Sequence, residues 1–308
     1  MVSPNAVSVS FHLREEQIAE CGGHLREVLQ RVEAVGLDAV GVGDHVSFIG
    51  GTGTDGLITA AALLAANERL TVRTGVYLLP LRHPVLVARQ LVTISQMAPG
   101  RLVFGVGVGG EDLHEYAVCE IDPHRRGARA DEALPLLRKL LTGRPVTHRG
   151  RFFNVEAAQV APGAPGLRII VGGRSDAALQ RAGRFGDGWI GVWISPRRFA
   201  EATALVAGAA AEAGRTDVAW RNEHQGWCFF DPDPAAATER ARCVIGASYN
   251  LPFERFARYT PCGPPEVVAD ALRPFLALGV RQFNLVADAA RLEYAIEQAG
   301  LVRRLLNA

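Results

Sequence analysis

The sequence predicts an α/β protein of the (β/α)8 barrel class, built as a single domain over residues 1–308. Eight strand-like segments alternate with helix-like segments along the whole chain. Residues 167–193 contain one complete strand–helix–strand unit, and a connection of that kind joins parallel strands. A chain of this length is also common for one barrel. A doubly wound open sheet is the alternative architecture.

The expected strands are short runs of apolar, often β-branched residues. The run Leu-Arg-Ile-Ile-Val at 167–171 is typical of a buried strand. Gly75 lies inside the third run, and a glycine within a strand usually marks a bulge or a close approach of backbone. In chain order, the strands are expected at 6–11, 39–42, 70–79, 101–104, 167–171, 189–193, 224–230 and 281–286.

Helices are expected between these strands, where apolar residues recur at spacings of three and four. Asp122 is expected to cap a helix that begins with Pro123, a residue favoured at the first helical position. Residues 148–155 are expected to form a small hairpin, and insertions are expected in the loops after strands 4, 6 and 7. The helices are expected at 23–35, 57–67, 85–97, 123–141, 178–185, 196–213, 232–245, 264–278 and 292–306.

Composition excludes several classes of function. The formal net charge of +1 provides no strong electrostatic surface for nucleic acid or for a membrane, and no apolar run is long enough to span a bilayer. Residues 1–10 lack the basic start and apolar core of a signal peptide. The five cysteines are dispersed without a CxxC pair, which favours reduced thiols over disulfides or a zinc site. We therefore expect a cytoplasmic protein whose partner is a small molecule.

In a barrel of this class, function lies where the strands end and the following loops begin. That rule brings together residues that are far apart in the sequence. The residues expected at this mouth of the barrel are His12, Asp44, His45, Gly109, Gly110, Glu111, residues 172–175, Trp193 and Phe230.

The segment Gly172-Gly173-Arg174-Ser175, between a strand and a helix, is typical of an anion site. Two glycines let the backbone approach a ligand closely, and Ser175 is a natural N-cap. The free N–H groups of the helix start, together with the Arg174 guanidinium, suit a phosphate. The structural alternative is that the glycines only turn the chain and Ser175 only caps the helix.

Asp44-His45 follows the second strand and has two interpretations. It is either a capping aspartate beside a polar histidine, or a hydrogen-bonding and proton-transfer pair, because histidine titrates near neutral pH. Glu111 is either a second acid or a solvated loop carboxylate. Trp193 and Trp227 either line an apolar pocket or belong to the core. Weaker candidates are His12, His114 and His224.

Other kinds of site are disfavoured. Gly105, Gly107 and Gly110 match a G-x-G-x-x-G pattern, but Glu111 and Asp112 follow at once and would repel a pyrophosphate. No cluster of His, Asp and Glu suggests a metal, and no G-x-S-x-G elbow provides a nucleophile. A site with a phosphate cradle but neither metal nor nucleophile is expected to take its chemistry from a bound cofactor.

These residues resemble those of the bacterial-luciferase-like flavin and deazaflavin oxidoreductases, over nearly the whole chain. The resemblance implies a TIM barrel that binds coenzyme F420 or FMN, usually as a homodimer. Its most specific part is the last of the matching motifs, which are Gly43-Asp44-His45, Thr74-Gly75-Val76 with Arg82-His83-Pro84, Gly107-Val108-Gly109-Gly110-Glu111, and Gly172-Gly173 with residues 182–189.

The resemblance also implies roles for individual residues. Asp44 and His45 would lie against the ring in the deazaflavin branch, and Gly75-Val76 matches a bulge with a non-prolyl cis peptide behind the ring. Glu111 would act as an acid. The implied cofactor-binding residues are Asp44, Gly75, Val76, Gly109, Gly110, His114, Gly172, Gly173, Arg174 and Ser175, and the expected substrate pocket contains His12, Trp193 and Trp227.

The implied chemistry is hydride transfer between F420 and a small organic substrate, with His45 or Glu111 handling the coupled proton. The loop at 46–49 lacks the tryptophan found in the family's sugar-phosphate dehydrogenases, which disfavours glucose 6-phosphate and favours a more apolar substrate of specialised metabolism. Two alternatives stay open. One is an FMN-dependent monooxygenase that receives reduced flavin from a partner reductase, and the other is a non-catalytic barrel that binds flavin or no cofactor.

Overall fold

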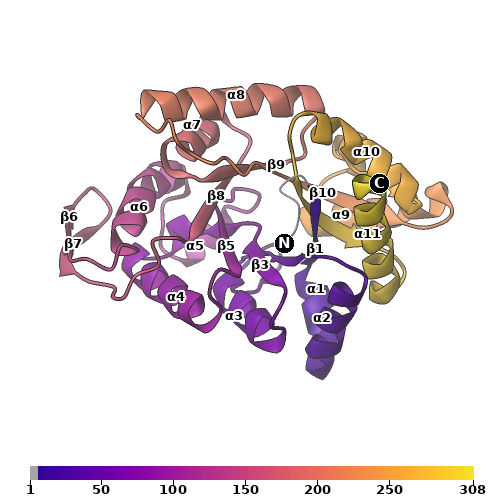
Figure 1. Ribbon diagram of the computed structural model, residues 1–308, viewed down its shortest axis with the longest axis horizontal. Coiled ribbons are helices and arrows are strands. Elements are labelled where there is room, and N and C mark those ends of the chain that lie inside the picture. Colours follow the sequence, from indigo (N-terminus) through magenta and orange to yellow (C-terminus); the bar gives the residue numbers. More distant parts are fainter. Residues whose placement is uncertain (1–5) are drawn as a thin grey trace.

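Eight parallel strands close into a barrel in the computed structural model, which describes residues 6–308 (Figure 1). Each strand pairs with the next along the ring, and the last pairs with the first. The predicted (β/α)8 barrel is therefore confirmed, and the open doubly wound sheet is wrong. The strands are β1 Ser8–Leu13, β2 Ala39–Val42, β3 Thr71–Thr74 with β4 Tyr77–Leu78, β5 Leu102–Gly107, β8 Arg168–Gly172, β9 Gly188–Val192, β10 Glu223–Phe230 and β12 Gln282–Asp288.

One helix follows each barrel strand and packs on the outside of the ring (Figure 1). Apolar side chains between helices and strands, such as Leu29, Val32 and Phe283, are almost fully buried and form one continuous core. Burying such side chains is the main favourable contribution to folding. Within residues 6–308 the barrel helices are α2 Leu25–Ala34, α3 Gly56–Ala66, α4 Pro84–Met97, α6 Arg126–Leu140, α7 Asp176–Phe185, α8 Pro196–Glu212, α10 Pro265–Ala277 and α11 Leu292–Asn307.

Two of the three predicted insertions are present. The loop after the fourth barrel strand holds α5 His114–Val118 and the 3-10 turn η3 Pro123–Arg125. The insertion after the seventh strand is the largest. It comprises α9 Pro234–Tyr249, η4 Phe253–Arg255, η5 Ala257–Tyr259 and β11 Cys262–Gly263.

The insertion predicted after the sixth strand is wrong. Helix α8 begins at Pro196, four residues after the end of β9, because Ser195 caps it and Pro196 suits the first helical position. The predicted hairpin is present as β6 Val146–Arg149 and β7 Asn154–Ala158, between α6 and β8. Helix α1 Glu15–Cys21 was not expected from the sequence, and the first residues of the helix expected at 23–35 form the separate turn η1 Gly22–His24 before α2.

The third barrel strand is not continuous over residues 70–79 as predicted. Strand β3 ends at Thr74, a cis peptide bond joins Gly75 to Val76, and β4 continues for two residues before the turn η2 Leu79–Leu81. The non-prolyl cis bond that the family resemblance implied is therefore present at the expected position. Residues 1–10 were expected not to form a signal peptide. The first five of them lie outside the described residues. From residue 6 to the end, no helix has the length and apolar character needed to cross a membrane.

A buried ion pair occupies the barrel interior beside the amino-terminal end of β10. Arg73 donates to both carboxylate oxygens of Glu223, at 2.7 and 2.9 Å, and the two side chains are only 4% and 2% exposed. Burial raises the pKa of Glu223, and the Arg73 charge opposes that rise. Two charges this far from water are tolerated only because each neutralises the other.

We expect that Glu223→Gln lowers the free energy of unfolding by about 3–5 kcal/mol, because it leaves the Arg73 charge buried without a counter-ion. The double variant Arg73→Met/Glu223→Leu removes both charges and is expected to recover most of that loss. Urea unfolding followed by tryptophan fluorescence measures both values. A single variant as stable as the wild type would show that the pair contributes nothing to holding the barrel together.

Candidate active site

A cavity of about 640 Å³ opens at the carboxyl ends of the barrel strands. It is lined by almost all of the residues predicted from the sequence, which come from seven of the eight strands or their following loops. A volume of this size suits a bound organic molecule. The predicted residues that line it are His12, Asp44, His45, Gly75, Val76, Gly109, Gly110, Glu111, Gly172, Gly173, Arg174, Ser175, Trp193 and Trp227.

Three other candidates lie elsewhere. His114 is exposed at the start of α5 and does not line the cavity, because the neighbouring Glu115 is the α5 residue that points inward. Phe230 is 1% exposed and packs in the core between strand and helices rather than at the mouth. His224 lines a separate cavity of about 490 Å³ between β10 and α10. It is 6% exposed, and burial lowers its pKa to about 4.

The segment at 172–175 has the form of an anion cradle. A Cβ at Gly172 would lie 2.7 Å from Val76, and one at Gly173 would lie 2.6 Å from Ala178, so both positions need glycine. Gly173 also has a φ of +133°, which side chains rarely tolerate. Ser175 caps α7 by accepting the Ala178 N–H, as predicted. The first turn of α7 therefore directs its free N–H groups toward the cavity wall.

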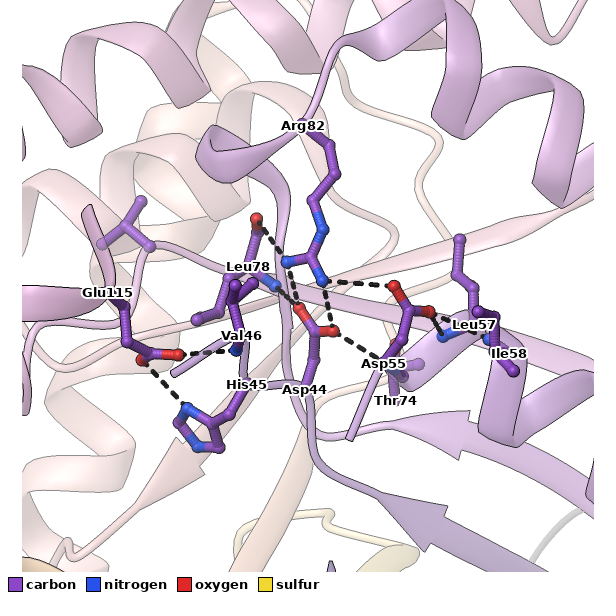
Figure 2. A network of polar contacts seen from close by, with 12 residues as sticks. Asp44, His45, Val46, Asp55, Leu57, Ile58, Thr74, Leu78, Arg82 and Glu115 are labelled. Carbon is purple, nitrogen blue, oxygen red and sulfur yellow. Dashed lines mark hydrogen bonds and ion pairs between the residues drawn. The ribbon is translucent and has the colours of Figure 1, made fainter. Parts of the chain in front are cut away.

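Asp44 holds together three elements around the cavity mouth (Figure 2). Its carboxylate accepts two hydrogen bonds from Arg82, at 2.6 and 2.8 Å, and one each from the backbone N–H groups of Gly56 and Leu78. Arg82 also reaches Asp55, the N-cap of α3, at 3.3 Å. The end of β2, the start of α3 and the end of β4 are thus joined by a single carboxylate.

Asp44 and His45 do not form the hydrogen-bonded pair that was one of the two interpretations of this motif, because Asp44 bonds to Arg82, Gly56 and Leu78 and His45 to Glu115. Burial raises the pKa of Asp44, while the Arg82 charge and the backbone N–H groups oppose the rise. Four N–H donors already surround its two oxygens, so neither oxygen has a free position for a ligand proton. Asp44 is therefore a positioning residue for the loop that carries His45.

His45 pairs instead with Glu115, which comes from helix α5 in the loop after β5 (Figure 2). Its Nδ1 lies 3.0 Å from Glu115 Oε2, and Glu115 Oε1 accepts the backbone N–H of Val46 at 2.8 Å. The imidazole also stacks against Phe48, with ring centroids 4.1 Å apart. Within residues 6–308 the other ring nitrogen, Nε2, has no hydrogen-bond partner, which leaves it available to a molecule in the cavity.

The Glu115 carboxylate shifts the pKa of His45. Burial alone would lower the pKa of His45, but the hydrogen bond and negative charge of Glu115 outweigh it and raise that pKa above the ordinary value. Burial would likewise raise the pKa of Glu115, but the bonds from His45 and Val46 hold it below its usual range. The pair is therefore a carboxylate that stabilises the charged form of the imidazole in front of it.

An aromatic wall faces the cavity from β9, β10 and α9. Trp193 and Trp227 are stacked with centroids 6.3 Å apart, and Tyr249 stands at 81° to Trp193. Trp193 has a φ of +51°, an uncommon conformation for a bulky residue and one that costs free energy. The predicted pocket and core roles of these tryptophans both hold, because the same rings line the cavity and pack on Phe229.

Glu111 is exposed on the loop after β5 and lines the cavity. Within residues 6–308 it makes no ion pair, so its role as a second acid stays a prediction. No pattern in the sequence pointed to Glu115, because its pairing with His45 spans 70 positions. Tyr249 was equally hidden, inside an alanine-rich helix. No group of His, Cys, Asp and Glu in the described part of the chain could hold a metal ion.

Comparison with known families gives a match to one family model. The model described as luciferase-like monooxygenase matches residues 6–261. An F420-dependent glucose-6-phosphate dehydrogenase from Kribbella flavida is 30% identical over 295 residues, which covers 84% of this chain and 86% of the relative. An uncharacterized protein of Mycobacterium tuberculosis is 35% identical over 162 residues, but the chain spans only 55% of its length.

Solved structures of low sequence identity share the fold. An F420-dependent secondary alcohol dehydrogenase, in complex with an F420-acetone adduct, superposes with a TM-score of 0.84 at 21% identity, covering 98% of this chain and 100% of that one. The oxygenating constituent of 3,6-diketocamphane monooxygenase from Pseudomonas putida, in complex with FMN, has a TM-score of 0.73 at 18% identity, with 96% and 97% covered. Both establish likeness of fold alone.

We expect Glu115→Gln to lower the pKa of His45, because the variant keeps the hydrogen-bonding shape but removes the negative charge that favours imidazolium. A histidine-selective NMR titration measures that pKa directly. Glu16→Gln, which removes a charge at the cavity rim without touching His45, is the matched control and is expected to leave the pKa nearly unchanged. An identical His45 pKa in the Glu115 variant and the wild type would contradict the assigned tuning.

Proposed function

The chain belongs to the luciferase-like monooxygenase family, and we propose that it is an F420-dependent oxidoreductase acting on a small organic substrate. The main observation behind this proposal is the His45–Glu115 pair, which places an imidazole with a raised pKa at the wall of a cavity of cofactor size. The F420-dependent dehydrogenase among its relatives, aligned over most of both chains, supports the deazaflavin as the cofactor.

The residues around the cavity fit such a cofactor. The segment Gly172–Ser175 would hold its phosphate, since both glycines leave the backbone open and Arg174 makes no ion pair within the described residues. Gly75, Gly109 and Gly110 line the same cavity and leave room for a flat ring, and Val76 lines it beside them. The cofactor would supply a carbon that accepts or donates a hydride, a chemistry that no side chain of the cavity provides.

The chain's own residues then handle the proton that accompanies the hydride. His45 holds or gives a proton at Nε2, while Glu115 fixes the ring through Nδ1 and stabilises the imidazolium. In other carboxylate–histidine pairs the carboxylate likewise orients the imidazole that acts as the base. Glu111 is the competing proton carrier, because it faces the same cavity from another loop.

The walls of the cavity suggest an apolar substrate. Phe48 and Ile49 stand on one side, and Trp193, Trp227 and Tyr249 on another. Within the lining, no lysine is present to hold a sugar phosphate, and Arg14 is already paired with Asp288. The other lining arginines are Arg174, which we assign to the cofactor phosphate, and Arg126, which donates to the backbone of Pro123. These features favour a substrate with an apolar body, so we propose this in place of glucose 6-phosphate. The homodimer and the cytoplasmic location stay predictions.

The second candidate function is an FMN-dependent monooxygenase that receives reduced flavin from a partner reductase. The FMN complex among the solved structures of the same fold supports this alternative. Titration of the purified protein with F420 and with FMN separates the two. Tight, saturable binding of F420 alone is expected, binding of FMN alone would favour the monooxygenase, and binding of neither would leave a non-catalytic barrel.

His45→Gln is expected to reduce the rate of F420 reduction by about 10²–10⁴-fold, since proton transfer by a positioned side chain contributes that much. The dissociation constant for F420 should stay close to the wild-type value. Stopped-flow absorbance with secondary alcohols as probes gives the rate, and Glu111→Gln is the isosteric comparison. Turnover that survives in the His45 variant but fails in the Glu111 variant would transfer the proton role to Glu111.

Gly173→Ala is expected to weaken F420 binding by about 10–100-fold, because the added methyl collides with Ala178 and displaces the N–H groups that would hold the phosphate. Gly100→Ala is the matched control. Gly100 also has a positive φ, +72°, but its Cβ would meet no atom within 4 Å, and it lies outside the cavity. Equal F420 affinity in both variants would place the phosphate elsewhere.

A further inference from the structure

A chain of hydrogen bonds crosses the barrel interior beneath the candidate active site. Gln225 Nε2 lies 3.2 Å from the carbonyl oxygen of Gly75, and Gln225 Oε1 lies 2.8 Å from Asn284 Nδ2. The same Asn284 Nδ2 lies 3.0 Å from His12 Nδ1. The four residues come from β10, β12, β1 and the break between β3 and β4, so the chain spans the width of the barrel.

The direction of every bond in this chain follows from its first member. A backbone carbonyl can only accept, so the Gln225 amide must present its nitrogen to Gly75 and its oxygen to Asn284. Asn284 must therefore present its nitrogen, which carries two hydrogens and donates one to Gln225 and the other to His12. The cost is that Asn284 Oδ1 has no partner within the described residues.

His12 consequently has a fixed tautomer. Its Nδ1 accepts a hydrogen bond and cannot carry a proton, so the single ring proton of neutral imidazole must sit on Nε2. Burial, followed by the nearby charges of Arg14 and Arg73 and by His45, lowers the pKa of His12 to about 3. The ring is therefore neutral at every pH in which the protein is expected to work.

The Nε2–H group faces the cavity. A Cβ placed on Gly41, deeper in the barrel, would lie 2.7 Å from His12 Nδ1, whereas one on Gly43, at the cavity wall, would lie 3.9 Å from Nε2. Nδ1 thus points down to Asn284 and Nε2 points up. A Cβ on Gly41 would lie 2.5 Å from Asn284 Oδ1, and one on Gly75 would lie 2.5 Å from Gln225 Oε1. Glycine at both positions therefore leaves room for the hydrogen-bonded chain.

We propose that His12 is a permanent hydrogen-bond donor at the floor of the cavity, and that it selects a carbonyl oxygen on the bound molecule. A group that can only donate, such as an ammonium, is rejected there because it would leave a buried N–H opposite another donor. His12 takes no part in proton transfer, in contrast to His45. Asn284 and Gln225 act through His12 and are positioning residues.

The carbonyl has two possible sources, the pyrimidine ring of the cofactor and the substrate itself. The choice between them rests on the proposed function, whereas the tautomer of His12 does not. The two parts of the inference are therefore tested separately, first without any ligand and then with F420 and a ketone probe.

The tautomer is tested on the ligand-free protein by long-range ¹H–¹⁵N NMR of its histidines. The expected His12 signals are those of a neutral ring protonated at Nε2, unchanged from pH 5 to pH 8, while His45 titrates. In Asn284→Asp the carboxylate cannot donate, so a proton is expected to move to Nδ1. A wild-type His12 that carries its proton on Nδ1, or that titrates between pH 5 and 8, overturns the proposal regardless of any cofactor.

The ligand is tested with His12→Gln, whose amide can still donate, and His12→Phe, which cannot. If the cofactor supplies the carbonyl, His12→Phe raises the dissociation constant for F420 about tenfold and His12→Gln restores most of the affinity. If the substrate supplies it, F420 affinity stays unchanged, and the His12 Nε2–H signal of the F420 complex shifts with cyclohexanone but not with cyclohexylammonium.

Normal affinity for F420 in His12→Phe, together with no response of the Nε2–H signal to either probe, overturns the selection of a carbonyl. Should the protein bind neither F420 nor FMN, the proposed function fails, yet the NMR result on the ligand-free protein still decides the tautomer. The two failures are therefore distinguishable.

Discussion

The Asp44 carboxylate is the contact on which the arrangement of the mouth depends. The loop after β2 has little regular structure of its own, yet it must hold an imidazole in one orientation above the barrel. Asp44 provides that order by accepting four N–H groups from Arg82, Gly56 and Leu78, which belong to segments that are otherwise independent. Because a charged hydrogen bond is stronger than a neutral one and both partners are shielded from water, this junction is stiff.

The barrel interior holds polar groups at several levels beside the apolar cluster of Val103, Ile170 and Ile190, and their character changes from base to mouth. The base holds a full ion pair, Arg73 with Glu223, whose charges cancel. Above it lies the uncharged chain of amides that ends at His12. At the mouth lies His45, whose pKa Glu115 raises above its ordinary value. A group suited to proton exchange thus stands where a ligand would enter.

Much of the fold was predictable because it depends on local patterns. The strands and helices follow from apolar periodicity, and the Ser175 cap follows from residue type alone. The insertion predicted after the sixth strand was wrong, although the expected helix start at Pro196 was right, because Ser195 and Pro196 begin α8 only four residues after β9 ends. The break in the third strand was foreseen only through the family resemblance and the glycine at position 75.

The site was predictable as a set of positions but not as a set of contacts. Strand ends bring residues such as His12 and Gly172 to one mouth, and the barrel topology guarantees that convergence. Which side chain faces which is decided by three-dimensional packing. Glu115 lies 70 positions from its partner, and Asn284 lies 272 positions from His12, so no local pattern signals either contact. Asp44 was wrongly paired with His45 because neighbours in sequence point in different directions at a strand end.

Tyr249 belongs to the insertion after the seventh strand, apart from the segments that carry His45 and Glu115. The catalytic candidates stand on strand ends and on loops tied to them, whereas part of the aromatic wall is contributed by α9, a segment outside the repeating barrel pattern. A substitution in that segment can therefore reshape the aromatic wall without displacing the imidazole and its carboxylate, which belong to other loops.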